Sequence, residues 1–441
     1  MLICQWFQRA RFARLLLAVA FGALQTQGLA QTDLAVPNTL SLAAAKRLAF
    51  ARNWDLLAAQ SGVDAATAQL LVAREFPNPT FSYSTAKIGS YENSTATGNG
   101  LWSRSYDTIF AVNQLVEIGG KRHDRKTSAQ AGVIGAQARF YDARRLLDQG
   151  VAKAYIAALL AGENARVLNE SAKLLRHEME IAQARLHAGD LSEADEKQIE
   201  NNADIFALQA KSAEAAAVQA RIAVEILLGG NEPKGNWTPA ETLAQMTFTA
   251  PPATDLTTDF LRPDVLAAQA DLNQSQADLK LQKVMRIPDP TFSFLVEHNP
   301  PGGGPPADTV GIGVSFPLPL WNLNGGEIKS AQATVAKNAL ALAKAKAQAA
   351  ADIANAQSEF QEASDRLARY QNQILPKSQK VREAVAFAFE KGGATLVDLL
   401  EAERADNDAR LATAQALADT ASAAADLKSA TAVVNLPNNR P

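Results

Sequence analysis

Cysteine is nearly absent from this chain of 441 residues, which contains only Cys4. Cys4 precedes the first apolar run, in a segment that we expect to be removed. The mature protein is therefore predicted to have neither a disulfide nor a cysteine-linked lipid. Strong charge of either sign is lacking too, since the net charge is −3 and there are four histidines. This balance argues against nucleic acid as a partner.

Long hydrophobic runs are scarce. Three arginines, Arg9, Arg11 and Arg14, precede the apolar run 15–24, and small residues follow at 28–30 (Gly-Leu-Ala). This is the pattern of a secretory signal with its cleavage site, so we expect residues 1–30 to be a signal peptide. A membrane anchor is the alternative, but the run is short of the roughly 20 residues that a spanning helix needs.

Beyond the N-terminus we find no stretch of about 18 apolar residues, so no helix of the mature chain is expected to cross a bilayer. If the exported protein enters a membrane, it must do so with strands.

Catalytic and cofactor motifs are absent as well. The sequence shows no Gly-rich phosphate loop, no nucleophile and base arrangement, and no Cys/His ligand cluster. The stretch 177–180 (His-Glu-Met-Glu) lacks a second histidine one turn on, so a solvent-facing helix surface explains it better than a metal site. We therefore expect no enzymatic activity, no cofactor and no bound metal.

What the chain does contain is a tandem repeat. Residues 77–82 (Pro-Asn-Pro-Thr-Phe-Ser) return as residues 288–293 (Pro-Asp-Pro-Thr-Phe-Ser), each time after a helical run and before alternating residues. In the first copy the helical pattern covers 40–75, where Pro77 and Pro79 forbid continuation. Each copy becomes one supersecondary unit that must bury its apolar surface against other copies.

Alternation of polar and apolar residues predicts two strands in each copy. They cover 80–84 and 106–116 in the first copy, and 291–296 and 310–316 in the second. Val310, Ile312, Val314 and Phe316 share one strand face, opposite glycine and serine. Each pair of strands is expected to form a hairpin, with the polar stretches 89–103 and 299–306 as its loops.

Each hairpin is followed by a glycine pair and a very long helical pattern, 121–187 and 327–389, which at 1.5 Å per residue would span roughly 100 Å. Apolar residues recur every seven positions, the spacing of a coiled-coil seam. The seam residues are Leu160, Val167, Leu174 and Ile181 in the first copy and Ile353, Phe360, Leu367, Ile374 and Val381 in the second. Return helices are expected over 191–228 and 395–434, after glycine-marked turns.

Four strands cannot enclose a lumen, because about eight are needed merely to enclose side chains. An open edge in lipid would leave backbone groups unsatisfied, at several kcal/mol each. If these strands enter a membrane, several chains must complete the barrel.

The order of helix, hairpin, long helix and return helix, all repeated, resembles the TolC family of outer-membrane channel proteins over nearly the whole mature chain. The opening 40–59 is similar to that of the family. Residues 117–122 (Glu-Ile-Gly-Gly-Lys-Arg) and 316–328 (Phe-Pro-Leu-Pro-Leu-Trp-Asn-Leu-Asn-Gly-Gly-Glu-Ile) resemble its cobalt-zinc-cadmium efflux branch.

The resemblance implies a mainly α fold with a membrane β-barrel, in which two tandem repeats of helix, β-hairpin and long helical hairpin assemble as a homotrimer. The trimer would form a 12-stranded barrel in outer-membrane lipid and a periplasmic α-helical tunnel. Its implied partners are a periplasmic adaptor protein and an inner-membrane pump of the resistance-nodulation-division type. The expected domains are a signal peptide 1–30, a first efflux repeat 31–229, a connector 230–258 with little regular structure, a second efflux repeat 259–434 and a tail 435–441.

Two acidic residues lie just after the turn that joins the second long helix to its return helix. Asp398 and Glu401 are three residues apart, so they share one helix face. Spacing alone favours a solvated charged face. The resemblance places both at the periplasmic constriction of the tunnel, where three copies would form an electronegative ring that favours cations.

The two helical tips resemble family segments that dock the adaptor. The resemblance implies Arg185, Leu186, Gly189 and Ser192 in the first tip and Gly392 and Gly393 in the second, although each tip could be a helix reversal only. Three aromatic residues at strand ends, Trp102, Tyr106 and Trp321, are expected at the membrane–water boundary, with local loop packing as the alternative.

The leading hypothesis is an outer-membrane efflux duct that serves a divalent-cation pump. Export of drugs or of a secreted protein through the same architecture is the second. A soluble periplasmic coiled-coil adaptor is the alternative of another class, but it would have a single hairpin flanked by compact β domains.

Overall fold

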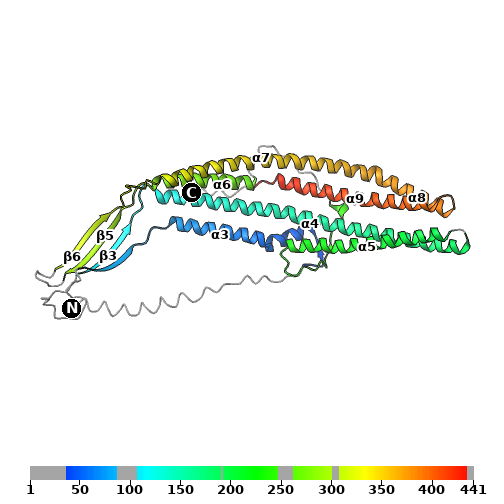
Figure 1. The fold of residues 1–441 in the computed structure, drawn as a ribbon, viewed down its shortest axis with the longest axis horizontal. Coiled ribbons are helices and arrows are strands. Elements are labelled where there is room, and N and C mark those ends of the chain that lie inside the picture. The colour runs from blue at the N-terminus through cyan, green and yellow to red at the C-terminus, as the bar shows by residue number, and fades with distance from the viewer. Residues whose placement is uncertain (1–35, 87–106, 190–191, 247–261, 300–306, 435–441) are drawn as a thin grey trace, which may run out of the picture. The chain divides into compact units, whose positions relative to one another are not determined.

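The computed structural model describes residues 36–86, 107–189, 192–246, 262–299 and 307–434. The elements below all belong to one unit, Asn38–Pro441. Figure 1 shows their order, which repeats helix, two strands, long helix and return helix. The predicted signal peptide, the two hairpin loops and the predicted tail lie largely or wholly outside the described residues.

The helix expected over 40–75 is two helices, α2 (Leu42–Arg52) and α3 (Trp54–Arg74). They meet at Asn53, whose ψ of 127° is not helical. The Asn53 side chain accepts a hydrogen bond from the Leu56 N–H and donates one to the Leu227 carbonyl at 3.0 Å. Asparagine caps a new helix here, and the break ties the start of α3 to the end of the return helix.

The first long helix, α4 (Lys121–Ala188), is continuous over 68 residues, as predicted. The second is interrupted, because α7 (Gly325–Arg369) passes through a π-helical turn, Tyr370–Ile374, into α8 (Leu375–Glu390). Pro376 explains the turn, since proline donates no hydrogen bond and clashes with the carbonyl four residues earlier. A π turn inserts one extra residue and so relieves that clash.

The π turn also corrects the predicted seam. Ile353 is buried, but Ile374 and Val381 are 43% and 55% exposed. One inserted residue rotates the following helix by about 100°, so the inward positions move on by one. Leu375 and Arg382 are partly buried, and Phe389 is 4% exposed. The seam continues beyond the π turn, shifted by a single residue.

The return helices are α5 (Glu193–Leu227) and α9 (Leu396–Ala430), and α6 (Pro263–Val284) opens the second copy. Contacts between α4 and helices α3, α5, α6 and α9 make α4 the centre of the packing (Figure 1). Near the turns, an apolar core joins α4, α5, α8 and α9 through residues such as Leu175, Ile199, Phe206, Phe389 and Leu399. Alanine is frequent in these contacts, which lets helices approach closely.

The four predicted strands form one antiparallel sheet in the order β2-β3-β5-β6. Their bounds are Thr80–Ala86 for β2, Asp107–Leu115 for β3, Thr291–Asn299 for β5 and Ala307–Ser315 for β6. Both predicted hairpins are present. The sequence did not predict that β3 pairs with β5, for example Val112 with Phe294. This pairing fuses the hairpins of the two copies into a single sheet.

The described part of the connector, residues 230–246, contains one short strand and packs against α4, and the rest of the connector lies outside the described residues. Its strand β4 (Thr238–Pro239) pairs in parallel with β1 (Thr39–Leu40). Trp237 is 2% exposed and stacks on Tyr155 of α4 at 5.8 Å between ring centres. The Tyr155 hydroxyl donates to the Leu40 carbonyl at 2.8 Å. The stacked pair of Trp237 and Tyr155 thus holds the connector and strand β1 against α4.

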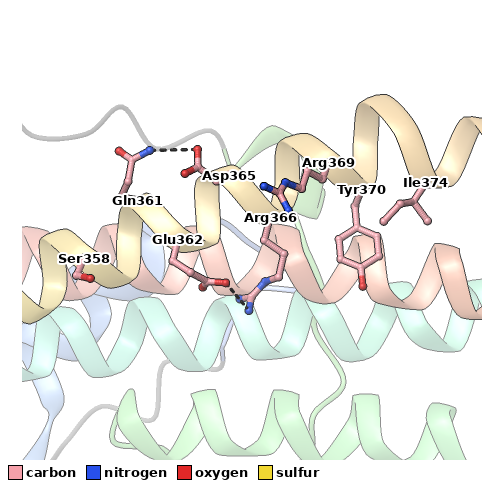
Figure 2. Close-up of a pocket in the computed structure, with 8 residues that line it drawn as sticks. All are labelled: Ser358, Gln361, Glu362, Asp365, Arg366, Arg369, Tyr370 and Ile374. Carbon is pink, nitrogen blue, oxygen red and sulfur yellow. Dashed lines mark hydrogen bonds and ion pairs between the residues drawn. The ribbon is translucent and has the colours of Figure 1, made fainter.

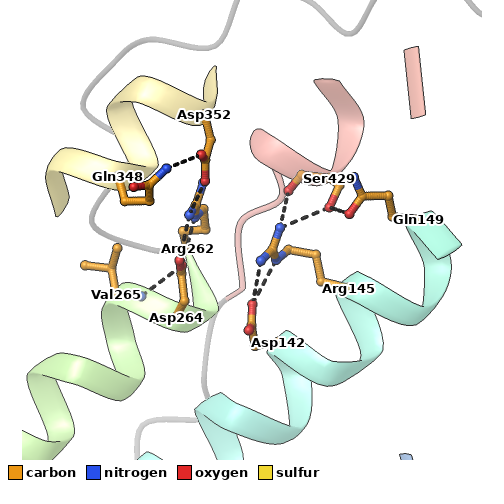
Figure 3. A network of polar contacts seen from close by, with 9 residues as sticks. All are labelled: Asp142, Arg145, Gln149, Arg262, Asp264, Val265, Gln348, Asp352 and Ser429. Carbon is orange, nitrogen blue, oxygen red and sulfur yellow. Dashed lines mark hydrogen bonds and ion pairs between the residues drawn. The ribbon is translucent and has the colours of Figure 1, made fainter. Parts of the chain in front are cut away.

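Figure 3 shows polar contacts at the start of α6 and the end of α9, beside α4 and α7. Arg262, at the start of α6, donates to Asp264 and to Asp352 of α7, at 2.6 and 2.9 Å. Beside it, Arg145 of α4 binds Asp142 and the Ser429 hydroxyl of α9. These contacts join α6 to α7 and α4 to α9.

Candidate channel elements

The sheet has two chemically different faces. Residues paired across antiparallel strands point to the same side, so the register places Phe81, Val112, Phe294 and Ile312 in one row. These side chains are exposed, from 44% for Val112 to 87% for Ile312.

The neighbouring row, on the opposite face, consists of Thr80, Asn113, Ser293 and Gly313. The opposite face is mainly small and polar, with Ile109 and Leu295 among the exceptions. Alternation between an exposed apolar face and a mainly polar face is the pattern of strands that separate lipid from a lumen.

Both outer edges of this sheet are open within the described chain. β2 pairs with β3 and β6 pairs with β5, and the order β2-β3-β5-β6 leaves one edge of β2 and one of β6 unpaired there. An open edge carries a row of unpaired N–H and C=O groups. The sheet is therefore ready to be extended at both sides.

The glycine-rich motif after β3 holds the sheet to the helices. Gly119 and Gly120 have φ of +73° and +83°, values that favour glycine. They turn the chain into α4, where the Lys121 ammonium, 4% exposed, lies 2.8 Å from the Asp289 carboxylate. Asp289 also accepts from the Ile118 N–H. The glycine-rich motif of the first copy is thus bound to the Pro-Asp-Pro motif of the second copy through Asp289.

One helix bears on the expectation that no helix of the mature chain crosses a bilayer, which stays a prediction. By length and composition, α3 is long and apolar enough to do so. The search for an unbroken apolar run missed it because Asp55, Gln60 and Asp64 interrupt the sequence. α3 packs along α4, and Arg122 and Arg125 of α4 bind the carbonyls at its C-terminal end. Its packing assigns α3 to the helical bundle.

The first helical tip is described on both sides of residues 190–191. Gly189 ends α4 with φ +83°, and its N–H donates to the Leu186 carbonyl at 3.0 Å. Ser192 begins α5, where its hydroxyl oxygen accepts from the Asp195 N–H. Asp190 and Leu191 lie outside the described residues. Each of these roles is structural, and the predicted docking role of the tip stays a prediction.

The second tip uses the same chemistry. The Gly392 N–H donates to the Phe389 carbonyl and the Gly393 N–H to that of Ala388, at 3.1 and 2.7 Å. The Arg185 guanidinium of the first tip lies 5.1 Å from the centre of the Phe389 ring. This cation–π contact joins the two tips, so they present one combined surface.

The two predicted constriction acids are exposed within one chain. Asp398 closes a capping box, since its carboxylate accepts from the Thr395 N–H and hydroxyl, at 2.9 and 2.6 Å. These hydrogen bonds lower the pKa of Asp398, so it is held as an anion. Glu401, one turn on, is exposed too. Asp398 therefore has a local structural role that the sequence analysis did not assign, and the constriction itself stays a prediction.

Beyond the tips lies a buried ionic cluster that the sequence analysis missed. Arg382 of α8 lies 3.5 Å from Glu403 and 3.4 Å from Asp406, both on α9. Arg410 pairs with Asp406 at 2.8 Å. The acids are at most 8% exposed. Burial raises the pKa of Glu403, and Arg382 opposes that rise. The partners come from two helices, so sequence spacing could not reveal them.

Figure 2 shows the hollow beside the π turn, lined by residues such as Arg366, Arg369 and Tyr370. Gln361 donates to Asp365 at 3.1 Å, and Arg366 pairs with Glu362 at 3.2 Å and with Asp419 of α9 at 2.8 Å. The hollow is a polar helix surface whose Arg366 is engaged with acids on both sides.

The remaining predicted residues divide by location. Trp102 and Tyr106 lie outside the described residues, whereas Trp321 is described and 94% exposed. His177 and Glu180 are exposed and 3.5 Å apart. Within the described ranges, no group of three or more His, Cys, Asp or Glu side chains is placed to hold a metal ion.

A model of the family described as outer membrane efflux protein matches residues 46–230 and 261–433. The chain belongs to the outer membrane efflux protein family. This confirms the predicted family and the outer-membrane location. It favours the channel over the soluble adaptor. The predicted domain bounds stay predictions.

Two relatives carry names of metal-resistance proteins. The cobalt-zinc-cadmium resistance protein CzcC of Cupriavidus metallidurans is 27% identical over 377 residues, which cover 84% of this chain and 85% of CzcC. The nickel-cobalt-cadmium resistance protein NccC of Alcaligenes xylosoxydans xylosoxydans is 27% identical over 278 residues, or 63% of this chain and 60% of NccC.

Solved channel structures share the fold. The structure of CusC matches with a TM-score of 0.76 at 16% identity, covering 89% of this chain and 92% of CusC. The outer-membrane channel OprN matches with 0.75 at 20% identity, covering 88% and 89%. The open state of the Neisseria gonorrhoeae MtrE channel matches with 0.72 at 21% identity, covering 88% of each chain. The mostly helical fold is that of outer-membrane efflux channels.

Proposed function

We propose that three copies of this efflux protein form one passive exit duct through the outer membrane. The two-faced sheet with open edges carries this proposal. Three copies of a four-stranded sheet would supply twelve strands, enough for a barrel with a lumen. Closure would pair every edge, which lipid demands because unsatisfied backbone groups cost several kcal/mol each.

The helices would continue the duct into the periplasm. α4 and the α7–α8 helix are long enough, at roughly 100 Å each, to carry a tunnel away from the membrane. The two tips, joined through Arg185 and Phe389, would meet a periplasmic adaptor, and an inner-membrane pump of the resistance-nodulation-division type would drive the substrate. The duct performs no covalent chemistry in this proposal.

Divalent metal cations are the proposed substrate. The likeness to two metal-resistance proteins supports this class. The tip supports it as well, because the Asp398 and Glu401 side chains are both exposed there. Three copies of Asp398 and Glu401 would give six carboxylates around one axis, a ring that favours cations.

Planar-bilayer conductance tests the constriction. Replacing Asp398 and Glu401 together by Ala should raise the conductance or lower the preference for cations over anions. The double variant Glu359→Ala and Glu362→Ala is the matched control, because it removes the same charge at the same spacing from exposed positions on α7. Equal changes in both variants, or none in either, would remove Asp398 and Glu401 from the constriction.

The substrate class is tested in cells. Loss of the protein should increase sensitivity to cobalt, zinc or cadmium salts and leave tolerance of hydrophobic drugs unchanged. The opposite result would support the drug duct. Detergent-extracted protein should behave as a trimer by native mass spectrometry, and a monomeric particle that stays dissolved without detergent would contradict the barrel.

A further inference from the structure

Two apolar segments are exposed at opposite edges of the sheet. The first, residues 71–76, leads into β2, and its Leu71, Val72 and Phe76 are 58%, 55% and 70% exposed. The second, residues 316–323, follows β6 and is called the strap here. The exposed fractions of its large apolar side chains run from 57% to 94%, for Phe316, Leu318, Leu320, Trp321 and Leu323. Contiguous apolar surface of this kind marks a contact site.

Both segments are held in place by polar contacts. The Arg122 guanidinium lies 3.9 Å from the centre of the Phe76 ring, and its Nε donates to the Arg74 carbonyl at 2.8 Å. At the end of the strap, the Arg286 Nε donates to the Leu323 carbonyl at 2.9 Å. Asn324, at φ +57°, donates to the Gln282 carbonyl at 2.8 Å. The backbones are anchored to α4 and α6 while the apolar side chains face outward.

Strand direction decides what can lie beside each segment. All neighbours in the order β2-β3-β5-β6 are antiparallel, so β2 and β6 run in opposite directions. When β6 of one copy meets β2 of the next, the alternation continues, and the end of β6 lies beside the start of β2. The strap follows the end of β6, and residues 71–76 precede the start of β2 (Figure 1).

We propose that the strap of one copy docks on residues 71–76 of the next copy, forming an apolar collar where the strands give way to helices. The inference rests on the proposed closure of the barrel across copies. It adds a specific contact that the sheet edges alone do not require.

Charge favours protein over lipid as the occupant. Arg122 packs on Phe76, and Arg125, which is paired with Glu117, donates to the carbonyls of Ala73 and Glu75. Charged side chains are costly at hydrocarbon depth. Residues 71–76 therefore belong on the aqueous side of the membrane boundary, where their apolar side chains need a protein partner.

Disulfide trapping tests the contact in the full-length protein. The background is Cys4→Ser, which removes the only native cysteine. Phe76→Cys is combined with either Leu318→Cys or Leu320→Cys, because the tilt of closed strands leaves the exact register to be found. After mild oxidation in membranes, denaturing gels should show covalent dimers and trimers for at least one pair, and monomer for each single variant.

The matched control is Trp54→Cys with Leu320→Cys. Trp54 is exposed at the start of α3, about 20 residues before Phe76 and so roughly 30 Å from it. The Phe76 pair should give about tenfold or more cross-linked product than this control, because a disulfide needs Cβ atoms about 4 Å apart. Equal cross-linking of both pairs would overturn the proposal.

Native mass spectrometry of the protein without oxidation distinguishes failure of the docking contact from failure of the proposed duct. A trimer with no cross-link in either Phe76 pair would overturn the docking contact and leave the proposed duct intact. A monomer without cross-links would overturn both. A spin label at position 320 that is relaxed by membrane-dissolved oxygen would also overturn the contact, because lipid would then cover the strap.

Discussion

Removing Arg382 should loosen the helical tips in a pH-dependent way. Arg382 reaches from α8 to two nearly buried acids of α9, Glu403 and Asp406. In the Arg382→Ala variant, Asp406 keeps Arg410 and the Ser378 hydroxyl. Glu403 keeps no comparable partner in that variant. In the described part of the chain its Oε1 has no hydrogen-bond partner, and its ion pair is with Arg382.

The magnitude follows from burial. Two unit charges about 4 Å apart attract by about 4 kcal/mol at an effective dielectric of about 20. Breaking a buried ion pair costs about 3–5 kcal/mol because one charge is left uncompensated. The Arg382 side chain is 19% exposed, so we take the lower end, about 3 kcal/mol.

The sign of the pH dependence follows from the Glu403 pKa, which burial already raises. A carboxyl with a raised pKa in the folded state contributes stability below its unfolded pKa, and that stability is lost as the pH rises through the folded value. Removing Arg382 raises the Glu403 pKa further. The destabilisation should therefore be greatest near neutral pH and should shrink as the pH falls toward 5. Glu178, whose pKa burial also raises, shifts in the same direction because Arg382 acts on it as well.

Hydrogen exchange of α8 and α9 measures the effect locally, with rates corrected for the intrinsic pH dependence. The double variant Arg382→Ala, Glu403→Gln should recover most of the lost protection at neutral pH. Arg369→Ala, an exposed arginine on α7, should change protection little. Equal losses at both pH values, or no recovery in the double variant, would refute the reasoning.

Two further predictions concern the connector and the end of the first repeat. Trp237→Ala should lower the free energy of unfolding by about 3–5 kcal/mol, because it empties a buried site beside Tyr155. Trp54→Ala, at a half-exposed position, should lower it less. Thermal unfolding in detergent compares the two variants. Gly229→Ala should lower the yield of folded protein far more than Gly120→Ala, although both glycines have positive φ. A Cβ at Gly229 would lie 2.5 Å from the Arg52 carbonyl oxygen, whereas one at Gly120 would meet open space. Comparable yields from the two variants would contradict this.

Much of the fold could be predicted from local signals. The proline-flanked repeat located β2 and β5, and alternation located β3 and β6 to within a few residues. These predictions succeeded because proline geometry and strand periodicity act over a handful of neighbouring residues.

The misses arise from less local causes. Asn53 is compatible with a helix, and only its bond to the Leu227 carbonyl shows why the chain breaks there. Pro376 was visible in the sequence, but a seven-residue pattern continues across it, and the inserted residue changes which positions face inward. The pairing of β3 with β5 joins segments far apart in the chain, so neither strand's pattern indicates its partner.

The candidate sites show the same division. Spacing brought Asp398 and Glu401 together and identified the glycines of the tips, because those relations lie within one helix or turn. The cluster of Arg382, Glu403 and Asp406 depends on the packing of α8 against α9. A shift of one residue at the π turn brings Arg382 to an inward position, so a prediction that missed the turn also missed the cluster.

The sheet and the helices constrain assembly in complementary ways. An apolar face as exposed as Ile312, at 87%, is unfavourable in water and favourable against lipid. The same lipid makes the open edges of β2 and β6 costly, and a single four-stranded sheet cannot curve far enough to pair its own edges. In the proposed duct, lipid would therefore cover the apolar face, and the open edges would pair with identical copies. The helices, with their charged tips, would remain in water, which would place the boundary between lipid and water near the strap and residues 71–76.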